Sequence, residues 1–181
     1  MEERTLKKRT VFQGKVLAVE VHEIELPGGR GSTREIVRHG GAVGVLVRRP
    51  DGVYVLVRQY RKAVESVLLE IVAGSLEPGE KPEACAIREV REESGYEVED
   101  LRPLGVIVLA PGYSSERLHL YTARVRADRK APLPDVDESL ETVFLTAEEL
   151  DRSIRRGEIV DAKTLAAWQL AGKESHHERE T

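Results

Sequence analysis

The chain has 181 residues, 33% of them charged and 40% hydrophobic, with a formal net charge of −4. This balance predicts one soluble globular domain, or one domain with a small appendage, and it excludes a disordered chain and disfavours nucleic acid as a partner. A single cysteine, Cys85, excludes an intrachain disulfide, and we expect it to be a small buried or half-buried filler rather than a nucleophile. No signal peptide and no apolar run of about 18 residues is found, so we expect a cytoplasmic protein without a membrane partner.

The first forty residues favour a small antiparallel β unit. Residues 1–9 are highly charged and are expected to fray. Loosely alternating apolar residues from Val11 to Leu26 predict two short strands with a turn or bulge at Gly14, and residues 33–38 predict a returning strand after a Gly-rich loop. Because so few strands are marginally stable alone, we expect residues 1–40 to pack on the main domain or on a second subunit.

Residues 41–173 combine predicted strands and helices. Two apolar, β-branched runs at 42–47 and 53–57 flank Asp51-Gly52, which is a strong hairpin signal. The remaining predicted strands are residues 67–73, 104–109, 118–125 and 140–145, and the predicted helices are residues 82–94, 146–156 and 161–171. This mixture predicts an α/β (α+β) layered domain, and residues 174–181 are expected to form a disordered tail.

The helix at 82–94 carries an unusual cluster of acidic residues. Pro82 suits a first helical position and Gly95 suits the end of a helix. Glu89, Glu92 and Glu93 are three and four residues apart and therefore share one face. The opposite face is expected to pack on the core and carries Ala84, Ile87, Val90 and Ser94.

Such a cluster has two interpretations. Charge runs on helices are usually solvated faces without a ligand. However, like charges at this spacing destabilise an isolated helix, and bound cations would offset that repulsion. Hard carboxylate oxygens are the ligands that Mg²⁺ or Mn²⁺ prefers. The cluster alone leaves both interpretations open.

The longer pattern resembles the Nudix box of the Nudix hydrolases. It reads Gly74, five residues, Glu80, seven residues, and then Arg88-Glu89-Val90-x-Glu92-Glu93-x-Gly95. The next residue, Tyr96, stands where the family more often has an aliphatic side chain. The resemblance implies the Nudix αβα sandwich with a mixed central sheet. It also implies hydrolysis of a nucleoside diphosphate linked to another group, with two or more Mg²⁺ ions, or Mn²⁺ as a substitute.

The resemblance further implies roles for individual residues. Glu89 and Glu93 match the central metal ligands, and Glu92 assists as a further ligand or by orienting water. The carbonyl oxygen of Ala73 is implied as an additional ligand. Arg88 is implied to be structural and to orient a box glutamate such as Glu80, because its fork of donors fits a carboxylate.

Three further stretches resemble the ADP-ribose pyrophosphatase branch of the family. They are residues 57–61 leading into 69–74, Pro111 at fifteen residues after Tyr96, and the acidic loop at 135–141. In this branch a glutamate of the acidic loop acts as a base or metal ligand. Glu138 matches it best, with Glu141 in reserve and Asp137 still open.

The same branch implies substrate contacts and an oligomeric state. Arg61 matches a diphosphate or ribose contact, against the alternative of a surface arginine at a strand end. Arg34 and Glu35 resemble a pair that contacts adenine and phosphate across a dimer, against the alternative of an ordinary exposed strand pair. Glu116 is implied to contact the terminal ribose. The branch is homodimeric with exchanged N-terminal strands. Its adenine-stacking aromatic is replaced here by Val16, with Phe12 nearby.

The sequence therefore predicts Mg²⁺-dependent hydrolysis of ADP-ribose to AMP and ribose 5-phosphate. The nearest alternative is the same chemistry on another nucleoside diphosphate sugar, such as GDP-mannose. A second alternative is a sensor that binds ADP-ribose without hydrolysing it. All box glutamates are present and no DNA-binding segment follows them, which disfavours the sensor.

Overall fold

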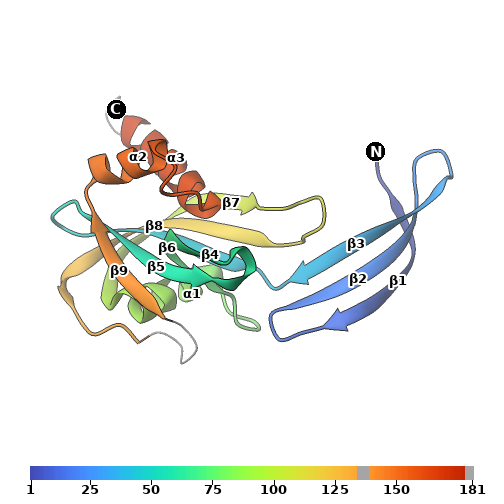
Figure 1. Ribbon diagram of the computed structural model, residues 1–181, viewed down its shortest axis with the longest axis horizontal. Helices are drawn as coiled ribbons and strands as arrows, with labels where there is room; N and C mark the ends of the chain where they lie inside the picture. The colour runs from blue at the N-terminus through green and yellow to red at the C-terminus, as the bar shows by residue number, and fades with distance from the viewer. Residues whose placement is uncertain (134–138, 178–181) are drawn as a thin grey trace. The chain divides into compact units, whose positions relative to one another are not determined.

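The computed structural model describes residues 1–133 and 139–177, and these residues form two compact units (Figure 1). The first unit comprises residues 1–41 and 107–117, and the second comprises residues 42–106 and the chain from 118 onward. Among the described residues, none of the helices has both the length and the apolar character that crossing a membrane requires.

The first unit is built on a three-stranded antiparallel sheet in the order β1-β2-β3. Its strands are β1 (Arg4–Gln13), β2 (Leu17–Glu25) and β3 (Gly31–His39). The expectation that residues 1–9 fray is wrong, because β1 begins at Arg4 and pairs with β2 along its length. An ion pair of 3.0 Å between Arg4 Nη2 and Glu25 Oε1 reinforces the start of that pairing.

Residues 107–117 join this unit through backbone hydrogen bonds to β3. The Val37 N–H donates to the Tyr113 carbonyl at 2.7 Å, and the Ser115 N–H donates to the Val37 carbonyl at 2.9 Å. These bonds hold the half-buried Glu116 close to His39, with 3.9 Å between Oε1 and Nδ1. The Pro111 loop and the end of β3 are therefore one structural element.

The second unit contains a six-stranded mixed sheet in the order β7-β8-β4-β6-β5-β9. β4 runs parallel to β8, whereas β4–β6, β5–β6 and β5–β9 are antiparallel pairs. The strands are β4 (Ala42–Arg48), β5 (Tyr54–Arg61), β6 (Ser66–Ser75), β7 (Tyr96–Val108), β8 (Arg117–Arg129) and β9 (Leu140–Leu145). The Asp51-Gly52 hairpin is confirmed, with the Gly52 N–H donating to the Arg49 carbonyl at 3.0 Å.

Helices lie on both faces of this sheet, which confirms the predicted helix–sheet–helix sandwich (Figure 1). One face carries α1 (Pro82–Glu89) and its continuation η2 (Val90–Ser94), a five-residue π-helical turn. The other carries α2 (Ala147–Arg155) and α3 (Ala162–His177), and a short 3₁₀ turn, η1 (Lys62–Val64), links β5 to β6. Thr146 and Glu149 form a capping box at the start of α2, and α3 continues beyond its predicted end at residue 171.

Strand alternation divides the core between the two faces. A cluster of valines from β4, β5 and β6 packs with Cys85, Ala86 and Val90 of the box helix. Leu46 and Leu56 are also fully buried and, by alternation, point to the side of α2 and α3. The burial expected for Cys85 is confirmed.

The predicted core face of the box helix is partly wrong. Ala84 and Ile87 are exposed, whereas Glu89 and Glu93 share the buried side with Val90 and Ser94. Burial of carboxylates is costly unless they are hydrogen-bonded or paired with charges. Here Glu93 accepts a hydrogen bond from the backbone of β6, and Glu89 accepts one from Arg88. The periodicity of the sequence does not reveal these contacts.

Gly95 ends the box helix with a positive φ of 75° and leaves room for a second backbone segment. A Cβ at this position would lie 2.1 Å from the carbonyl oxygen of Lys130. The Lys130 N–H donates to the Gly95 carbonyl at 2.9 Å, and the Leu133 N–H donates to the Glu92 carbonyl at 2.8 Å. The chain after β8 is thus fastened to the end of the acidic helix.

Gly95→Ala should therefore destabilise the fold more than Gly157→Ala. Gly157 also has a positive φ, 70°, but a Cβ there would meet nothing within 4 Å. Gly157→Ala should cost only the left-handed conformation, roughly 1–2 kcal/mol. Gly95→Ala adds a clash with backbone. Chemical denaturation measures both free energies of unfolding, and equal losses would contradict the assigned role of Gly95.

Candidate active site

Glu93 is placed against the backbone of β6. Its side chain comes from η2, it is only 2% exposed, and its Oε2 accepts a hydrogen bond from the Ala73 N–H at 3.1 Å. Val90 and Ser94, buried on the same turn, hold η2 against the sheet. The structure therefore brings together Glu93 and Ala73, two of the residues implied as metal ligands.

Glu89 lies in a space beside β6 that exists only because residue 74 is glycine, and we call this space the Gly74 cradle. Its side chain is 12% exposed, and a Cβ on Gly74 would lie 1.8–2.5 Å from the three atoms of the Glu89 carboxylate. Gly74 directly follows Ala73 on β6, so Glu89 and Glu93 are held by consecutive residues of one strand. The glycine that begins the box is thus explained by the close approach of a carboxylate.

Arg88 binds three of the box glutamates. Its Nε and Nη2 donate to Glu80 at 3.0 and 2.9 Å, which confirms the expected orienting role. In addition, its Nη1 donates to Glu89 at 2.7 Å and to Glu92 at 3.0 Å. These contacts, with the Glu80 hydrogen bonds first, raise the pKa of Arg88 and lower that of Glu80 to about 2. Glu80 and Arg88 therefore keep their charges at neutral pH.

The donor set fits a hard divalent cation. Glu89, Glu92 and Glu93 offer carboxylate oxygens, and the Gly74 cradle places one of them beside the β6 backbone. Within the described part of the chain, no three acidic, histidine or cysteine side chains already stand close enough together to hold a metal ion. Instead, Arg88 lies between Glu89 and Glu92.

Cys85 has no nucleophilic role in this arrangement. It is buried under the box helix, and this burial raises the pKa of its thiol to about 12. The thiolate is the reactive form of cysteine, and it is therefore scarce at neutral pH. Cys85 fills space between α1 and the sheet, as the sequence predicts.

Arg61 belongs to the same unit as the acidic helix and is paired with a carboxylate. Its Nε and Nη2 donate to the two oxygens of Glu70 at 2.9 and 2.7 Å. The hydrogen bonds to Glu70, and more weakly the negative charge of Glu93, raise the pKa of Arg61. The guanidinium is therefore within the electrostatic influence of the acidic helix.

Glu70 and Lys163 are two residues at this site for which sequence reasoning proposes no role. Glu70 is 1% exposed, and Lys163 of α3 donates a hydrogen bond to it. The sequence does carry a signal for Glu70, which is a single glutamate within the apolar run Leu68–Ala73. Once such a strand is buried, its carboxylate needs positively charged partners. Which cations it meets depends on tertiary contacts.

Other predicted site residues lie in the first unit. Arg34 is ion-paired with Glu3, Glu35 is exposed on β3, and Glu116 lies near His39. The two aromatic-site candidates, Val16 and Phe12, are both exposed there.

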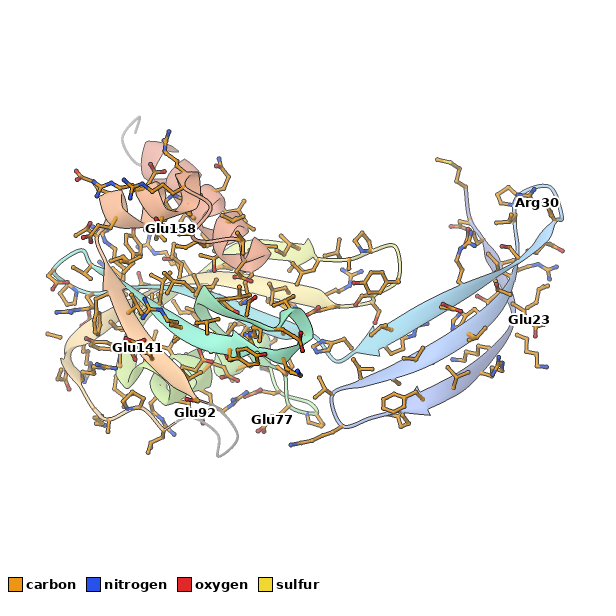
Figure 2. All side chains as sticks on the ribbon, viewed as in Figure 1. Glu23, Arg30, Glu77, Glu92, Glu141 and Glu158 are labelled. Carbon is orange, nitrogen blue, oxygen red and sulfur yellow. The ribbon has the colours of Figure 1, made fainter. Side chains whose placement is uncertain are left out.

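The acidic-loop candidates fall mostly outside the described residues, namely Asp137 and Glu138. Glu141 is described and lies on β9, where its Oε2 accepts a hydrogen bond from Arg58 Nη1 at 2.6 Å. Figure 2 labels Glu141 together with Glu92 of η2, and both belong to the second unit. Glu141, the reserve candidate for the base, is thus an exposed side chain that is ion-paired with a surface arginine.

Glu80→Gln tests the Arg88 cluster through pH. The folded-state pKa of Glu80, about 2, lies below its ordinary value, so its pairing stabilises the fold fully above about pH 5 and loses that contribution as pH falls toward 2. The difference in unfolding free energy between wild type and Glu80→Gln should therefore shrink across this range. Denaturation curves at pH 7, 5, 4 and 3 measure it, and a difference that stays constant would contradict the ion pair.

Comparisons with known proteins agree with this geometry. The family model described as the NUDIX domain matches residues 38–168. The chain is 41% identical over 169 residues to the methanol dehydrogenase activator of Bacillus methanolicus, covering 93% of this chain and 91% of that protein. It is 40% identical over 171 residues to the ADP-ribose pyrophosphatase of Bacillus subtilis strain 168, covering 93% and 92%.

A more distant relative and a solved structure extend the comparison. The GDP-mannose pyrophosphatase of Yersinia enterocolitica is 36% identical over 148 residues, covering 76% of each chain. The crystal structure of an ADP compounds hydrolase superposes with a TM-score of 0.84 at 23% identity, covering 98% of this chain and 96% of that one, which shows a shared fold. Members of this family generally need a divalent metal ion. The chain belongs to the Nudix family.

Proposed function

We propose that this protein is a metal-dependent hydrolase that cleaves the diphosphate of ADP-ribose to AMP and ribose 5-phosphate. The observation that carries the proposal is the acidic helix seated on β6, with Glu93 bonded to the Ala73 N–H and Glu89 in the Gly74 cradle. Hydrolysis of a phosphoanhydride is the family reaction. The named ADP-ribose pyrophosphatase of Bacillus subtilis, similar over nearly the whole chain, supports the choice of substrate.

The residues that would hold the metal are Glu89, Glu92 and Glu93, together with the carbonyl oxygen of Ala73. Two or more Mg²⁺ ions are proposed, with Mn²⁺ as a substitute. When bound, such ions neutralise the phosphate oxygens and lower the pKa of the attacking water. Arg88 holds Glu80, Glu89 and Glu92 together through its hydrogen bonds, so that the carboxylates are already gathered on one side of the helix.

The remaining steps are assigned to residues around this platform. Glu92, 31% exposed at its side chain, orients water or completes the ligand set. Arg61 binds the substrate diphosphate with the donors that Glu70 does not occupy. Glu138, which lies outside the described residues, is proposed as the base because it matches best the glutamate of the acidic loop in the ADP-ribose pyrophosphatase branch.

Specificity for ADP-ribose is assigned to the first unit. As the branch resemblance implies, Arg34 and Glu35 would contact adenine and phosphate across the dimer, and Glu116 would contact the terminal ribose. The half-buried position of Glu116 beside His39 supports a shaped site rather than a solvated loop. GDP-mannose is the second candidate substrate, because the Yersinia enterocolitica relative carries that name.

A homodimer through the N-terminal strands is part of the proposal. Large apolar side chains are exposed along β1 and the following turn, namely Leu6, Val11, Phe12 and Val16. Exposed apolar groups in such number on one strand and its turn, within a sheet of only three strands, favour coverage by a second copy. Light scattering on the eluted peak should give twice the mass of one 20.2 kDa chain, and a mass of one chain would contradict the dimer.

The assay that tests the proposed function is a panel of nucleoside diphosphate sugars with separated products. Wild type with Mg²⁺ should convert ADP-ribose to AMP and ribose 5-phosphate, and chelation should abolish the reaction. Glu93→Gln should lower kcat by a factor of roughly 10³ or more, because it removes a charged group from the catalytic cluster. Glu99→Gln, at an exposed position, is the matched control and should retain activity.

The panel also separates the alternatives. Faster cleavage of GDP-mannose than of ADP-ribose would overturn the choice of substrate but not the assignment of the protein as a hydrolase. Binding of ADP-ribose without any cleavage would overturn the enzyme and favour a sensor. Near-silent effects of Glu93→Gln would overturn the metal cluster.

A further inference from the structure

Glu70 is a buried charged group that the proposed reaction does not use. It is 1% exposed and stands on β6, three residues before Ala73. Burial would raise the pKa of its carboxyl, but the hydrogen bonds and charges of Arg61 and Lys163 outweigh burial and lower it. Glu70 is therefore a buried anion held between two cations from different elements, β5 and α3.

Lys163 fixes Glu70 from the side of α3. Its ammonium group, with a side chain 11% exposed, contacts Glu70 and also Asp161 Oδ1 at 2.9 Å. Asp161 in turn accepts hydrogen bonds from the N–H and hydroxyl of Thr164 at 3.0 and 2.6 Å. The Thr164 hydroxyl also accepts from the Ile71 N–H at 2.9 Å, next to Glu70. The start of α3 is thus anchored to β6 and does not swing away from Glu70.

Glu70 in turn sets the orientation of the Arg61 guanidinium. It takes Nε and Nη2, which leaves the Nη1 edge of the guanidinium for another anion. The Arg61 side chain is 40% exposed, unlike Glu70 beneath it. An unrestrained arginine loses much rotamer freedom when it binds a ligand, whereas one already held in a fork loses little.

We propose that Glu70, clamped by Lys163, is a positioning residue that orients Arg61 for the diphosphate of the substrate. The inference rests on the proposed function for the identity of the anion. What it adds is that Glu70 affects substrate binding by holding Arg61 in position. Lys163 then links the C-terminal helix to substrate affinity, although it contacts only Glu70 and Asp161 through the salt bridges described above.

A double-mutant cycle tests this path. Arg61→Met should raise the KM for ADP-ribose roughly tenfold or more, since it removes a charged hydrogen-bond donor. Glu70→Gln should raise KM about fivefold with kcat within about twofold, because the amide replaces the two-oxygen acceptor. In the Arg61→Met background, Glu70→Gln should change KM no further. An equal rise in both backgrounds, or an unchanged or lower KM in Glu70→Gln alone, would overturn the proposal.

Lys163 supplies a second series in case Glu70→Gln does not fold. Lys163→Met should raise KM in the wild-type background and leave it unchanged in the Arg61→Met background, whereas Lys163→Arg should restore most of the affinity. Leu150→Ala is the control for general destabilisation, because it removes a fully buried side chain outside this network. It should lower Tm without changing KM. A KM rise that follows Tm across all variants would show a merely structural role and overturn the proposal.

Calorimetry separates this inference from the proposed function. The Kd for ADP-ribose, measured without divalent metal, should follow the same cycle as KM. If wild type binds ADP-ribose but cleaves no nucleotide sugar, the proposed function fails and the cycle in Kd still decides the role of Glu70. If wild type neither binds nor cleaves ADP-ribose, both are overturned.

Discussion

The interaction on which the site depends is the set of ion pairs that Arg88 makes with Glu80, Glu89 and Glu92. Glutamates spaced by three and four residues repel one another on a helix. Here one planar guanidinium offsets that repulsion and lowers the pKa of Glu80 to about 2. The helix can therefore turn acidic side chains toward a sheet. The same arginine places a positive charge beside the buried carboxylate of Glu89.

The second constraint is that β6 serves two charged clusters at once. The Ala73 N–H binds Glu93, and the Gly74 cradle holds Glu89. On the same strand, Glu70 is ion-paired with Arg61 and Lys163. β6 lies inside the sheet between β4 and β5, so its backbone is held on both sides. The carboxylates proposed to bind cations and the guanidinium proposed to bind an anion are thus held against one rigid strand, an arrangement that suits catalysis by positioning.

Most elements of the second unit could be predicted from the sequence, because β-branched runs, Asp51-Gly52 and the Thr146 capping box are local signals. The box spacing likewise indicated Glu89, Glu92 and Glu93. Residues 4–10 of the exposed strand β1 were missed because these mostly charged residues show no apolar alternation. The buried side of α1 was misjudged, and Lys163 was overlooked, because both depend on tertiary partners. Glu89 is buried only because Gly74 has no side chain, and Lys163 meets Glu70 across 93 residues.

The central claim is that the acidic helix seated on Gly74 forms a divalent-cation site, and calorimetric titration of Mn²⁺ into Gly74→Ala tests it most directly. A Cβ at residue 74 would lie 1.8–2.5 Å from the Glu89 carboxylate and must displace it, whereas a Cβ at Gly31 would meet nothing within 4 Å. The account predicts that wild type and Gly31→Ala bind Mn²⁺ equally and that Gly74→Ala binds it at least about tenfold more weakly. Equal binding by Gly74→Ala, or no binding by wild type, would contradict it.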